Sequence, residues 1–362
     1  MQVQSNKLNF EGQNIFIGID VHKKSWTVCI FSERLEHKKF TQPPSADALK
    51  KYLHRNFPGA NYYSVYEAGF CGFHVHRNLL AVGIKNIVVN AADVPSTHKE
   101  KSGKTDRRDS RKLGRALRSG DLKGIHVPAR KTQEDRSLAR MRHTVGRDLA
   151  RVKTRIKSML NFYGIEHPDR FSSSGTHWSK RYMEWLRETM TAEMEEESGR
   201  ATLQALISEV EAMRGVQLET VRKMKVLSTT EFYAKDYKLL LGVPGIGLIT
   251  AMTFLVEIED INRFPSADDF ASLVGLVPDC RGTGEKTNNG DITSRAKKIM
   301  RTLIVECAWA ASRKDPALNL AYCKLCERME PNKALIRVAR KLLNRIYSVL
   351  KNKTEYAYGT VE

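Results

Sequence analysis

No apolar run in this sequence of 362 residues approaches the roughly 18 residues that a membrane-spanning helix needs. The start of the sequence, from Met1 to Lys7, also lacks the charged and then apolar order of a signal peptide. Only six cysteines are spread over the chain, whereas small disulfide-stapled secreted domains contain cysteine far more densely. We therefore expect a cytoplasmic protein that has reduced thiols and no membrane partner.

Acidic residues are too few to balance the basic ones. The chain has 60 Lys and Arg against 41 Asp and Glu, which gives a formal net charge of +19. This excess is larger than solubility requires and predicts a polyanionic partner. Hydrophobic residues make up 41% of the chain, which is enough for a real core and excludes wholesale disorder. The length favours two or three domains.

The first part of the chain alternates short apolar runs with turn signals. The runs cover residues 15–21, 26–31, 38–41, 62–66 and 86–89. A helical stretch at 45–57 lies between the third run and the fourth. This order predicts a three-stranded meander followed by strand and helix units, which is an α/β domain.

A long helix is predicted between residues 133 and 160, because apolar residues recur there at every third or fourth position. They form one narrow stripe, and the rest of the helix is strongly basic. A second stripe, from Leu203 to Met213 and loosely on to Leu227, follows an acidic stretch. The two stripes favour an antiparallel helical hairpin or a coiled-coil dimer, and a helical subdomain without self-association stays equally open.

A third region begins near residue 229 and consists of helices with glycine-rich connections. We expect these helices at 238–241, 248–257, 267–273, 295–313 and 333–350. The last of them has an apolar face and a basic face without any acid, which is typical of a nucleic-acid-binding helix. Its basic residues are Lys333, Arg337, Arg340, Lys341, Arg345, Lys351 and Lys353. The tail after Lys353 is expected to fray.

Four acids stand at the ends of predicted elements. Asp20 interrupts the end of the first apolar run, and Glu67 directly follows the fourth. Asp106 and Asp109 open a helix, where a spacing of three puts them on one face. Each acid alone is explained as a helix cap or dipole partner. Together they predict a divalent metal site, and hard oxygen ligands favour magnesium or manganese.

Basic residues surround the last two of these acids. They are Lys101, Lys104, Arg107, Arg108, Arg111 and Lys112. Metal and cations together stabilise the charge that develops on phosphorus, so this clustering favours a phosphodiester as the ligand.

Two glycine-rich segments are candidate phosphate contacts. Residues 242–247 form a helix-hairpin-helix pattern in which Gly245 and Gly247 would let the backbone approach a phosphate, although such hairpins also serve as plain packing. Residues 279–286 form a small-residue loop that places Thr283 between two glycines. Glycines would expose its hydroxyl to a phosphate, but the residues alone favour an ordinary turn. Lys286, Arg295, Lys297, Lys298 and Arg301 follow.

The order of these motifs resembles the DEDD transposases of bacterial insertion sequences of the one-ten family, which are bridge-RNA-guided recombinases. The motifs that carry the resemblance are Gly18-Ile19-Asp20-Val21-His22-Lys23, Tyr66-Glu67-Ala68-Gly69, Lys104-Thr105-Asp106-Arg107-Arg108-Asp109, Gly242-Val243-Pro244-Gly245-Ile246-Gly247, and Gly275-Leu276-Val277-Pro278 with Thr283-Gly284. The resemblance implies an α/β plus all-α protein. Its parts are a RuvC-like, RNase H-type domain over 14–125, a coiled-coil linker over 130–228, and a transposase domain with helix-hairpin-helix and nucleophile loop over 229–353.

The resemblance also implies the chemistry. Asp20, Glu67, Asp106 and Asp109 match the family's acids for Mg²⁺ or Mn²⁺. A serine in the C-terminal glycine loop attacks DNA and forms a covalent 5′-phosphoserine link. A structured RNA pairs with donor and target DNA, and dimers assemble into a tetramer. The protein is then expected in the bacterial cytoplasm, on the nucleoid when it is bound to DNA.

Thr283 aligns with the family's serine. Threonine keeps the hydroxyl but adds a methyl group and restricts χ1, which impedes an in-line approach. Two other functions therefore stay open, a hydrolytic nuclease or junction resolvase in which the four acids activate water, and a non-catalytic nucleic-acid scaffold. The candidate nucleic-acid-binding residues are Lys104, Arg107, Arg108, Gly245, Gly247, Lys286, Arg295, Lys297, Lys298, Arg337, Arg340, Lys341 and Arg345.

Overall fold

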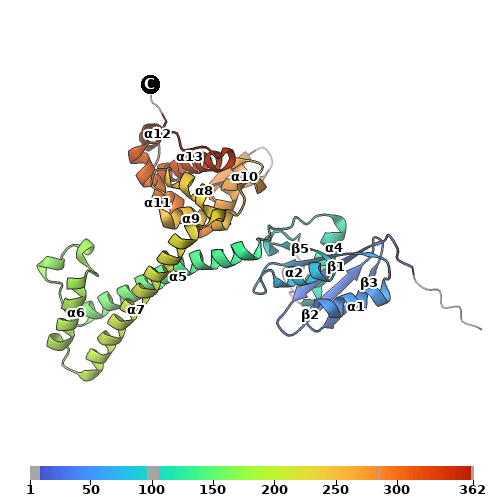
Figure 1. Cartoon of the computed structure of the whole chain (residues 1–362), viewed down its shortest axis with the longest axis horizontal. Helices are drawn as coiled ribbons and strands as arrows, with labels where there is room; N and C mark the ends of the chain where they lie inside the picture. The colour runs from blue at the N-terminus through green and yellow to red at the C-terminus, as the bar shows by residue number, and fades with distance from the viewer. Residues whose placement is uncertain (1–8, 96–105, 284–285, 360–362) are drawn as a thin grey trace, which may run out of the picture. The chain divides into compact units, whose positions relative to one another are not determined.

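The computed structural model of the chain describes residues 9–95, 106–283 and 286–359, with only the backbone described for residues 106–108, 280–283 and 286–291 (Figure 1). The chain divides into two compact units, Met1–Pro128 and Ala129–Glu362. No helix in the described part of the chain combines the length and the apolarity needed to cross a bilayer.

The first unit is built on a five-stranded sheet. Its strands are β1 (Asn14–Val21), β2 (Trp26–Phe31), β3 (Glu36–Gln42), β4 (Asn61–Glu67) and β5 (Lys85–Val89). Their order in the sheet is β3-β2-β1-β4-β5. The first three strands form an antiparallel meander, while β4 pairs in parallel with β1 and β5 pairs in parallel with β4. The predicted meander followed by strand and helix units is confirmed.

Alternation along β1 separates the two faces of the sheet. Ile15, Ile17 and Ile19 are fully buried in a cluster with residues of α1 (Ala46–Asn56) and α2 (His74–Ala81). The Oγ of Ser45 caps α1 by accepting a hydrogen bond from the Ala48 amide at 3.2 Å. A 3₁₀ turn, η1 (Ala91–Asp93), follows β5.

Helix α4 (Asp106–Ser119) packs on the opposite face of β1, and glycines allow the contact. A Cβ atom at Gly18 would lie 2.0 Å from the Ser110 carbonyl oxygen and 2.3 Å from the Gly114 nitrogen. A Cβ at Gly114 would in turn lie 2.7 Å from the Phe31 ring. The backbones of helix and strand therefore touch directly, and no larger residue fits between them.

Two long helices form a hairpin in the second unit. They are α5 (Arg130–Phe162) and α7 (Glu197–Ser228), with η2 (Asp169–Phe171), η3 (Ser174–Thr176) and α6 (Lys180–Glu193) between them. Leu149, Val152 and Ile156 of α5 are buried in one cluster with Leu203, Ile207 and Val210 of α7. The hairpin expected from the two stripes is confirmed, and this part of the stripe on α5 is buried within its own chain.

The remaining helices of the second unit enclose its largest core. They are α8 (Glu231–Leu241), α9 (Leu248–Ile258), η4 (Ile261–Arg263), α10 (Ala267–Val274), α11 (Lys298–Lys314), α12 (Pro316–Cys326) and α13 (Pro331–Asn352). The five expected helices are present. Helix α12 is not among these five; Asp315 caps it and Pro316 is its first residue, which is a usual helix start.

The segment expected to be a loop around Thr283 is instead a two-stranded hairpin. Strand β6 (Pro278–Thr283) pairs antiparallel with β7 (Lys286–Ile292), and Thr283 stands opposite Lys286. Backbone hydrogen bonds are sufficient for such pairing, so the small and polar residues do not prevent it.

The described part of the tail, residues 354–359, is held in place, contrary to the expectation that the tail frays. Its residues bind the carboxylate of Asp315, which is completely buried. The Tyr356 hydroxyl donates to Asp315 Oδ2 at 2.7 Å, and the Gly359 amide donates to the same oxygen at 3.3 Å. A buried carboxylate needs such partners, which is why the tail is held in place.

Candidate active site

Two of the four predicted acids lie side by side at one edge of the sheet. The parallel pairing of β1 with β4 sets Gly18 opposite Val65, and Asp20 and Glu67 are each two residues further along these strands. The same register therefore brings Asp20 opposite Glu67. Both acids stand at the carboxyl ends of these parallel strands. Neighbouring strands are about 4.8 Å apart, so the backbones of the two acids lie close together.

Asp20 points to the face of the sheet that α4 covers. It is two residues from Gly18 on β1, and side chains two apart in a strand share a face. Gly18 is the position where β1 touches the α4 backbone at Ser110 and Gly114.

The direction of α4 brings its first turn to the same edge. Ser110 meets Gly18, while Arg118, two turns later, lies over the ring of Phe31, with its guanidinium carbon 5.2 Å from the ring centroid. Phe31 pairs with Phe16, near the start of β1. The helix therefore runs antiparallel to β1, and its first residues lie toward the end of β1 that carries Asp20.

Helical spacing places Asp109 on the sheet-facing side of this first turn. Leu113 is buried against Val65 of β4, and Asp109 precedes it by one turn of the helix. Asp106 precedes Ser110 by one turn, and Ser110 is fully buried. The backbone of Asp106 begins α4, and its side chain is outside the described residues.

Asp20 and Glu67 have the oxygen donors of a site for a hard cation. Asp20 and Glu67 are partly exposed carboxylates, and the His22 Nε2 lies 3.2 Å from Asp20 Oδ2. Among the side chains that the structure describes, no three of His, Cys, Asp or Glu are grouped closely enough to hold a metal ion. Carboxylates at the ends of two adjacent strands are ligands of the kind that a hard divalent cation prefers.

Thr283, the predicted nucleophile, ends β6 in the second unit. Its backbone pairs with Lys286, the first residue of β7. The side chains of both residues are outside the described set, as are those of Arg107 and Arg108, and Lys104 lies outside the described residues altogether.

Two protein-family models match this chain, one over most of the first unit and helix α5, and one over a later part of the second unit. A family model of a DEDD transposase matches residues 17–165, which include all four acids. A second model, described as "Transposase IS116/IS110/IS902 family", matches residues 237–323, which include the glycine turn and the hairpin. The chain belongs to the IS110 family of DEDD transposases.

Curated relatives agree with this assignment. A putative transposase of Sinorhizobium fredii, y4qE, is 29% identical over 300 residues, which cover 81% of this chain and 71% of the relative. The transposase of insertion sequence element IS1111A of Coxiella burnetii is 21% identical over 95% of this chain and 91% of the relative. The transposase of IS1533 of Leptospira borgpetersenii is 24% identical over 82% of this chain and 85% of the relative. This IS110-family transposase is therefore a DNA transposase of an insertion sequence, and a transposase binds DNA.

The glycine turn of the transposase joins α8 to α9, and its two predicted phosphate contacts differ in their surroundings. Gly245 has φ +84°, and a Cβ atom there would lie 2.6 Å from the Cys307 carbonyl oxygen of α11. Packing against α11 therefore requires a glycine at position 245. Gly247 is the N-cap of α9, and no heavy atom lies within 4 Å of its Cβ position. Of these two glycines, only Gly247 has open space at its Cβ position.

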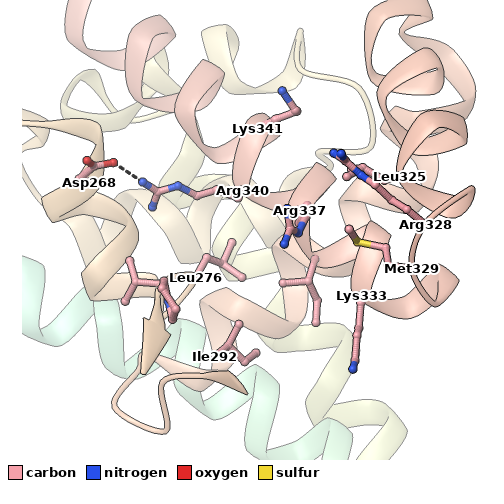
Figure 2. A pocket seen from close by; sticks show the side chains of 13 residues that line it. Asp268, Leu276, Ile292, Leu325, Arg328, Met329, Lys333, Arg337, Arg340 and Lys341 are labelled. Atoms are coloured by element: carbon pink, nitrogen blue, oxygen red, sulfur yellow. Dashed lines mark hydrogen bonds and ion pairs between the residues drawn. The ribbon is translucent and has the colours of Figure 1, made fainter. Parts of the chain in front are cut away.

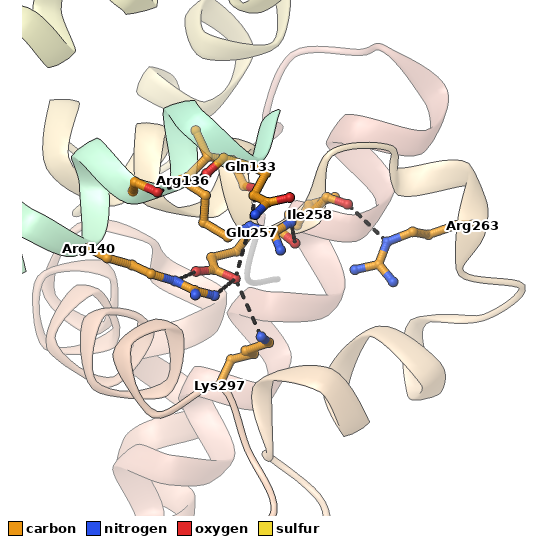
Figure 3. A network of polar contacts seen from close by, with 9 residues as sticks. Gln133, Arg136, Arg140, Glu257, Ile258, Arg263 and Lys297 are labelled. Atoms are coloured by element: carbon orange, nitrogen blue, oxygen red, sulfur yellow. Dashed lines mark hydrogen bonds and ion pairs between the residues drawn. The ribbon is translucent and has the colours of Figure 1, made fainter. Parts of the chain in front are cut away.

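A buried carboxylate organises the polar centre of the second unit (Figure 3). Glu257, near the end of α9, has a side chain that is only 1% exposed. Arg140 of α5 binds it with two hydrogen bonds, of 2.6 and 3.0 Å. Arg136 Nε lies 3.5 Å and Lys297 Nζ lies 3.7 Å from Glu257 Oε2. Arg136 also donates to the Val256 carbonyl oxygen at 3.0 Å.

Opposing effects set the pKa of Glu257. Burial alone would raise it, but the hydrogen bond from Arg140 and the charges of Lys297, Arg140 and Arg136 outweigh burial and hold the pKa below its usual range. Burial also lowers the pKa of Lys297, and the neighbouring Glu257 opposes that shift. The predicted nucleic-acid contact Lys297 is thus tied to a structural carboxylate directly before α11.

The other predicted cations lie in three places. Arg337, Arg340 and Lys341 lie together on one side of α13, next to the ends of β6 and β7. Arg345 is turned inward, where it donates to Asp315 Oδ2 and the Tyr356 hydroxyl, both at 2.6 Å. Arg295 and Lys298 are exposed near the start of α11.

Sequence reasoning missed Glu257 and its partner Arg140. The available signal was a single acid inside the otherwise apolar helix Leu248–Ile258. A carboxylate in such a helix is costly unless it is paired, so it predicts a cationic partner without identifying it.

Proposed function

We propose that this transposase is an RNA-guided DNA recombinase that cuts DNA through a hydroxyl nucleophile. The observation that carries the proposal is the meeting of Asp20, Glu67 and the first turn of α4 at one edge of the sheet. The strand order and the antiparallel meander support a RuvC-like, RNase H-type domain. The hairpin of α5 and α7 supports the coiled-coil linker, and α8 and α9 with their glycine turn support a helix-hairpin-helix.

Asp20, Glu67, Asp106 and Asp109 would hold Mg²⁺ or Mn²⁺. A divalent cation bound there neutralises charge on the phosphodiester and lowers the pKa of a coordinated hydroxyl group. The residues of the chain orient the ligands. The direct contact of Gly18 with α4 fixes the helix on the strand, and His22 holds one oxygen of Asp20.

Thr283 would be the nucleophile. Its Oγ1 forms a bond to phosphorus while the bond from phosphorus to the DNA 3′ oxygen breaks. The hydroxyl proton is lost to solvent, and the departing 3′ oxygen takes up a proton to become a free 3′-hydroxyl. The 5′ end stays joined to Thr283 as a phosphothreonine. During exchange the 3′-hydroxyl of another strand forms a bond to this phosphorus and loses its proton to solvent, while the bond from phosphorus to Thr283 Oγ1 breaks and Oγ1 takes up a proton. The extra methyl group of threonine slows the in-line approach.

The proposal also includes the partners. They are a structured guide RNA, donor and target DNA, and a second copy of the chain in a homodimer that forms a tetramer. The +19 net charge supports binding of two kinds of nucleic acid. The acids and Thr283 belong to separate units of the chain, which is compatible with a site assembled from two subunits.

The test is to trap the covalent product. The transposase, its RNA and labelled donor and target DNA are incubated with Mg²⁺, and the mixture is separated on a denaturing gel. We expect a weak protein–DNA adduct with wild-type protein, a stronger adduct with Thr283→Ser and none with Thr283→Ala. Binding of DNA and RNA should be equal in all three proteins.

Other outcomes select other functions. An adduct that persists in Thr283→Ala would place the nucleophile elsewhere, with Ser294 as the next candidate. Cleavage to a free phosphate would favour a hydrolytic nuclease or junction resolvase. Absence of cleavage by both the wild-type protein and the Thr283→Ser variant, while nucleic acids still bind, would favour a scaffold.

A further inference from the structure

A groove of about 1220 Å³ opens between the base of the β6–β7 hairpin and helices α12 and α13 (Figure 2). Part of its lining is apolar and part is charged; we call the apolar part the floor and the charged part the walls. The apolar lining consists of Leu276, Val277, Pro278, Ile292, Leu325, Met329 and Ile336. The charged lining consists of Arg328, Lys333, Arg337, Arg340 and Lys341, with Asp268 as the one acid among the described lining residues.

The cations of the groove exceed its acid. Asp268 pairs with Arg340, and this ion pair neutralises one of the five cations. The Nη1 nitrogen of Arg340 is buried and has no hydrogen-bond partner among the described residues. A buried donor without a partner is costly, so the site favours an anionic or hydrogen-bond-accepting ligand.

The apolar floor restricts which anion fits. A DNA duplex presents its phosphates outward and keeps its bases stacked, so it would leave the apolar surface around Met329 and Ile336 uncovered. An unpaired nucleotide offers both a phosphate for the cations and a flat base for the floor. The volume is ample, since pockets for small ligands hold about 300 to 1000 Å³.

The position of the groove indicates which strand would enter it. Pro278 and Ile292 stand opposite each other at the base of the hairpin whose far end carries Thr283. Thr283 is five positions beyond Pro278, which is about 17 Å along a strand. This span is a few nucleotides of single-stranded DNA.

We propose that this groove binds an extrahelical nucleotide of the DNA strand being cut, a few nucleotides from the scissile phosphate. Arg337 and Lys341 contact its phosphate, and Met329 and Ile336 contact its base. The choice of DNA rests on the proposed function, because it depends on Thr283 as the nucleophile.

The experiment measures binding and base environment without cleavage. Full-length protein is titrated in EDTA with single-stranded DNA that carries one 2-aminopurine, whose emission rises when the base leaves its stack. The described lining contains no aromatic ring that would quench the probe. We expect emission to rise on binding, and an abasic site at the probe position to weaken binding about tenfold.

Two paired variants separate the roles of the walls and the floor. Arg337→Ala with Lys341→Ala should weaken binding and reduce the salt slope by about 0.7, which corresponds to one phosphate of a single strand. Met329→Ser with Ile336→Ser should keep the slope and lose both the emission rise and the preference over abasic DNA. Lys235→Ala removes the same kind of charge from an exposed position of α8 and should change neither. Should the floor pair fail to fold, Met329→Ser alone supplies the same comparison.

Three results would overturn the proposal. The first is equal affinity for abasic and intact DNA. The second is an emission rise that survives in the floor variants. The third is tighter binding of RNA than of DNA of the same sequence, if the preference for RNA is lost when the residues of the groove are replaced. An adduct that persists in Thr283→Ala would overturn the proposed nucleophile alone, because this binding test needs no cleavage.

Discussion

The Arg140 guanidinium donates from Nε to Glu257 Oε1 at 2.6 Å and from Nη2 to Oε2 at 3.0 Å. This paired contact joins α5 to α9, and Lys297 brings the residue before α11 to the same carboxylate at 3.7 Å. A buried carboxylate is tolerated only when its oxygens are paired. Glu257 therefore fixes the long helix, the core helix and the segment that follows the β6–β7 hairpin to one another.

Removing this carboxylate should destabilise the second unit strongly. Glu257→Ala leaves Arg136, which is 8% exposed, and two more cations without their partner. We expect a loss of about 3–5 kcal/mol in the free energy of unfolding. Arg140→Ala should cost less, about 1–3 kcal/mol, because Arg136 and Lys297 stay near the carboxylate. Urea titration followed by circular dichroism measures both losses.

Arg147→Ala is the matched control for this prediction. Arg147 is an exposed arginine of the same helix, two turns beyond Arg140. Its replacement should change the unfolding free energy by less than about 0.5 kcal/mol. Equal effects of Arg140→Ala and Arg147→Ala would contradict the role given to Glu257.

The same carboxylate predicts a pH dependence. The folded-state pKa of Glu257 lies below its ordinary value of 4.5, so its contribution to stability is complete above that value and is lost as the pH falls through the folded pKa. The difference in unfolding free energy between wild type and Glu257→Gln should be constant at neutral pH and shrink below pH 4.5. A difference that stays constant down to strongly acidic pH would exclude the predicted pKa.

Gly18 should tolerate no side chain. In Gly18→Ala the new methyl group would lie 2.0 Å from a backbone oxygen of α4, so strand and helix must separate. We expect a loss of about 1–3 kcal/mol in stability and loss of DNA cleavage, since the first turn of α4 carries two of the four acids. Gly69→Ala, whose new atom would lie 4.0 Å from its nearest neighbour, should be stable. Normal stability of Gly18→Ala in thermal unfolding would show that α4 does not pack as described.

The acids should matter for cleavage and not for folding or RNA binding. Asp20→Asn keeps the size and removes the charge, so it should abolish adduct formation while guide RNA binding stays nearly unchanged. EDTA should have the same effect on wild-type protein. Asp47→Asn, at an exposed acid in the first turn of α1, serves as control. Full adduct formation by Asp20→Asn would remove this residue from the metal site.

The sequence predicted the elements of the first unit better than their contacts. Apolar runs with turn signals located the strands that carry Asp20 and Glu67, because local pattern determines such elements. The neighbouring position of these two acids depends on the parallel pairing of β1 with β4, which joins residues 47 apart in the chain. Pairing over such a distance is decided by the packed core, so a strand pattern alone does not predict it.

In the second unit, the sequence did not predict the β6–β7 hairpin or the contact of Arg140 with Glu257, and each has its own physical cause. The β6–β7 hairpin has no alternating apolar pattern, since glycine and polar residues dominate it and backbone bonds hold it. Arg140 lies 117 residues from Glu257, so no local signal connects them. The apolar stripe of α5 is predicted correctly from its spacing. The spacing does not say which helix covers the stripe, and the structure shows that Leu149 and Val152 pack against α7 of the same chain.

The binding of the tail to Asp315 has a practical consequence for anyone who attaches a tag or a reporter protein. A fusion joined directly after Lys353 would delete Tyr356 and Gly359, which donate two of the hydrogen bonds that this buried carboxylate accepts. Arg345 would then be its main remaining side-chain partner, at 2.6 Å. A reporter should therefore be joined after residue 359, so that a failure of the fusion protein is not mistaken for a defect in transposition.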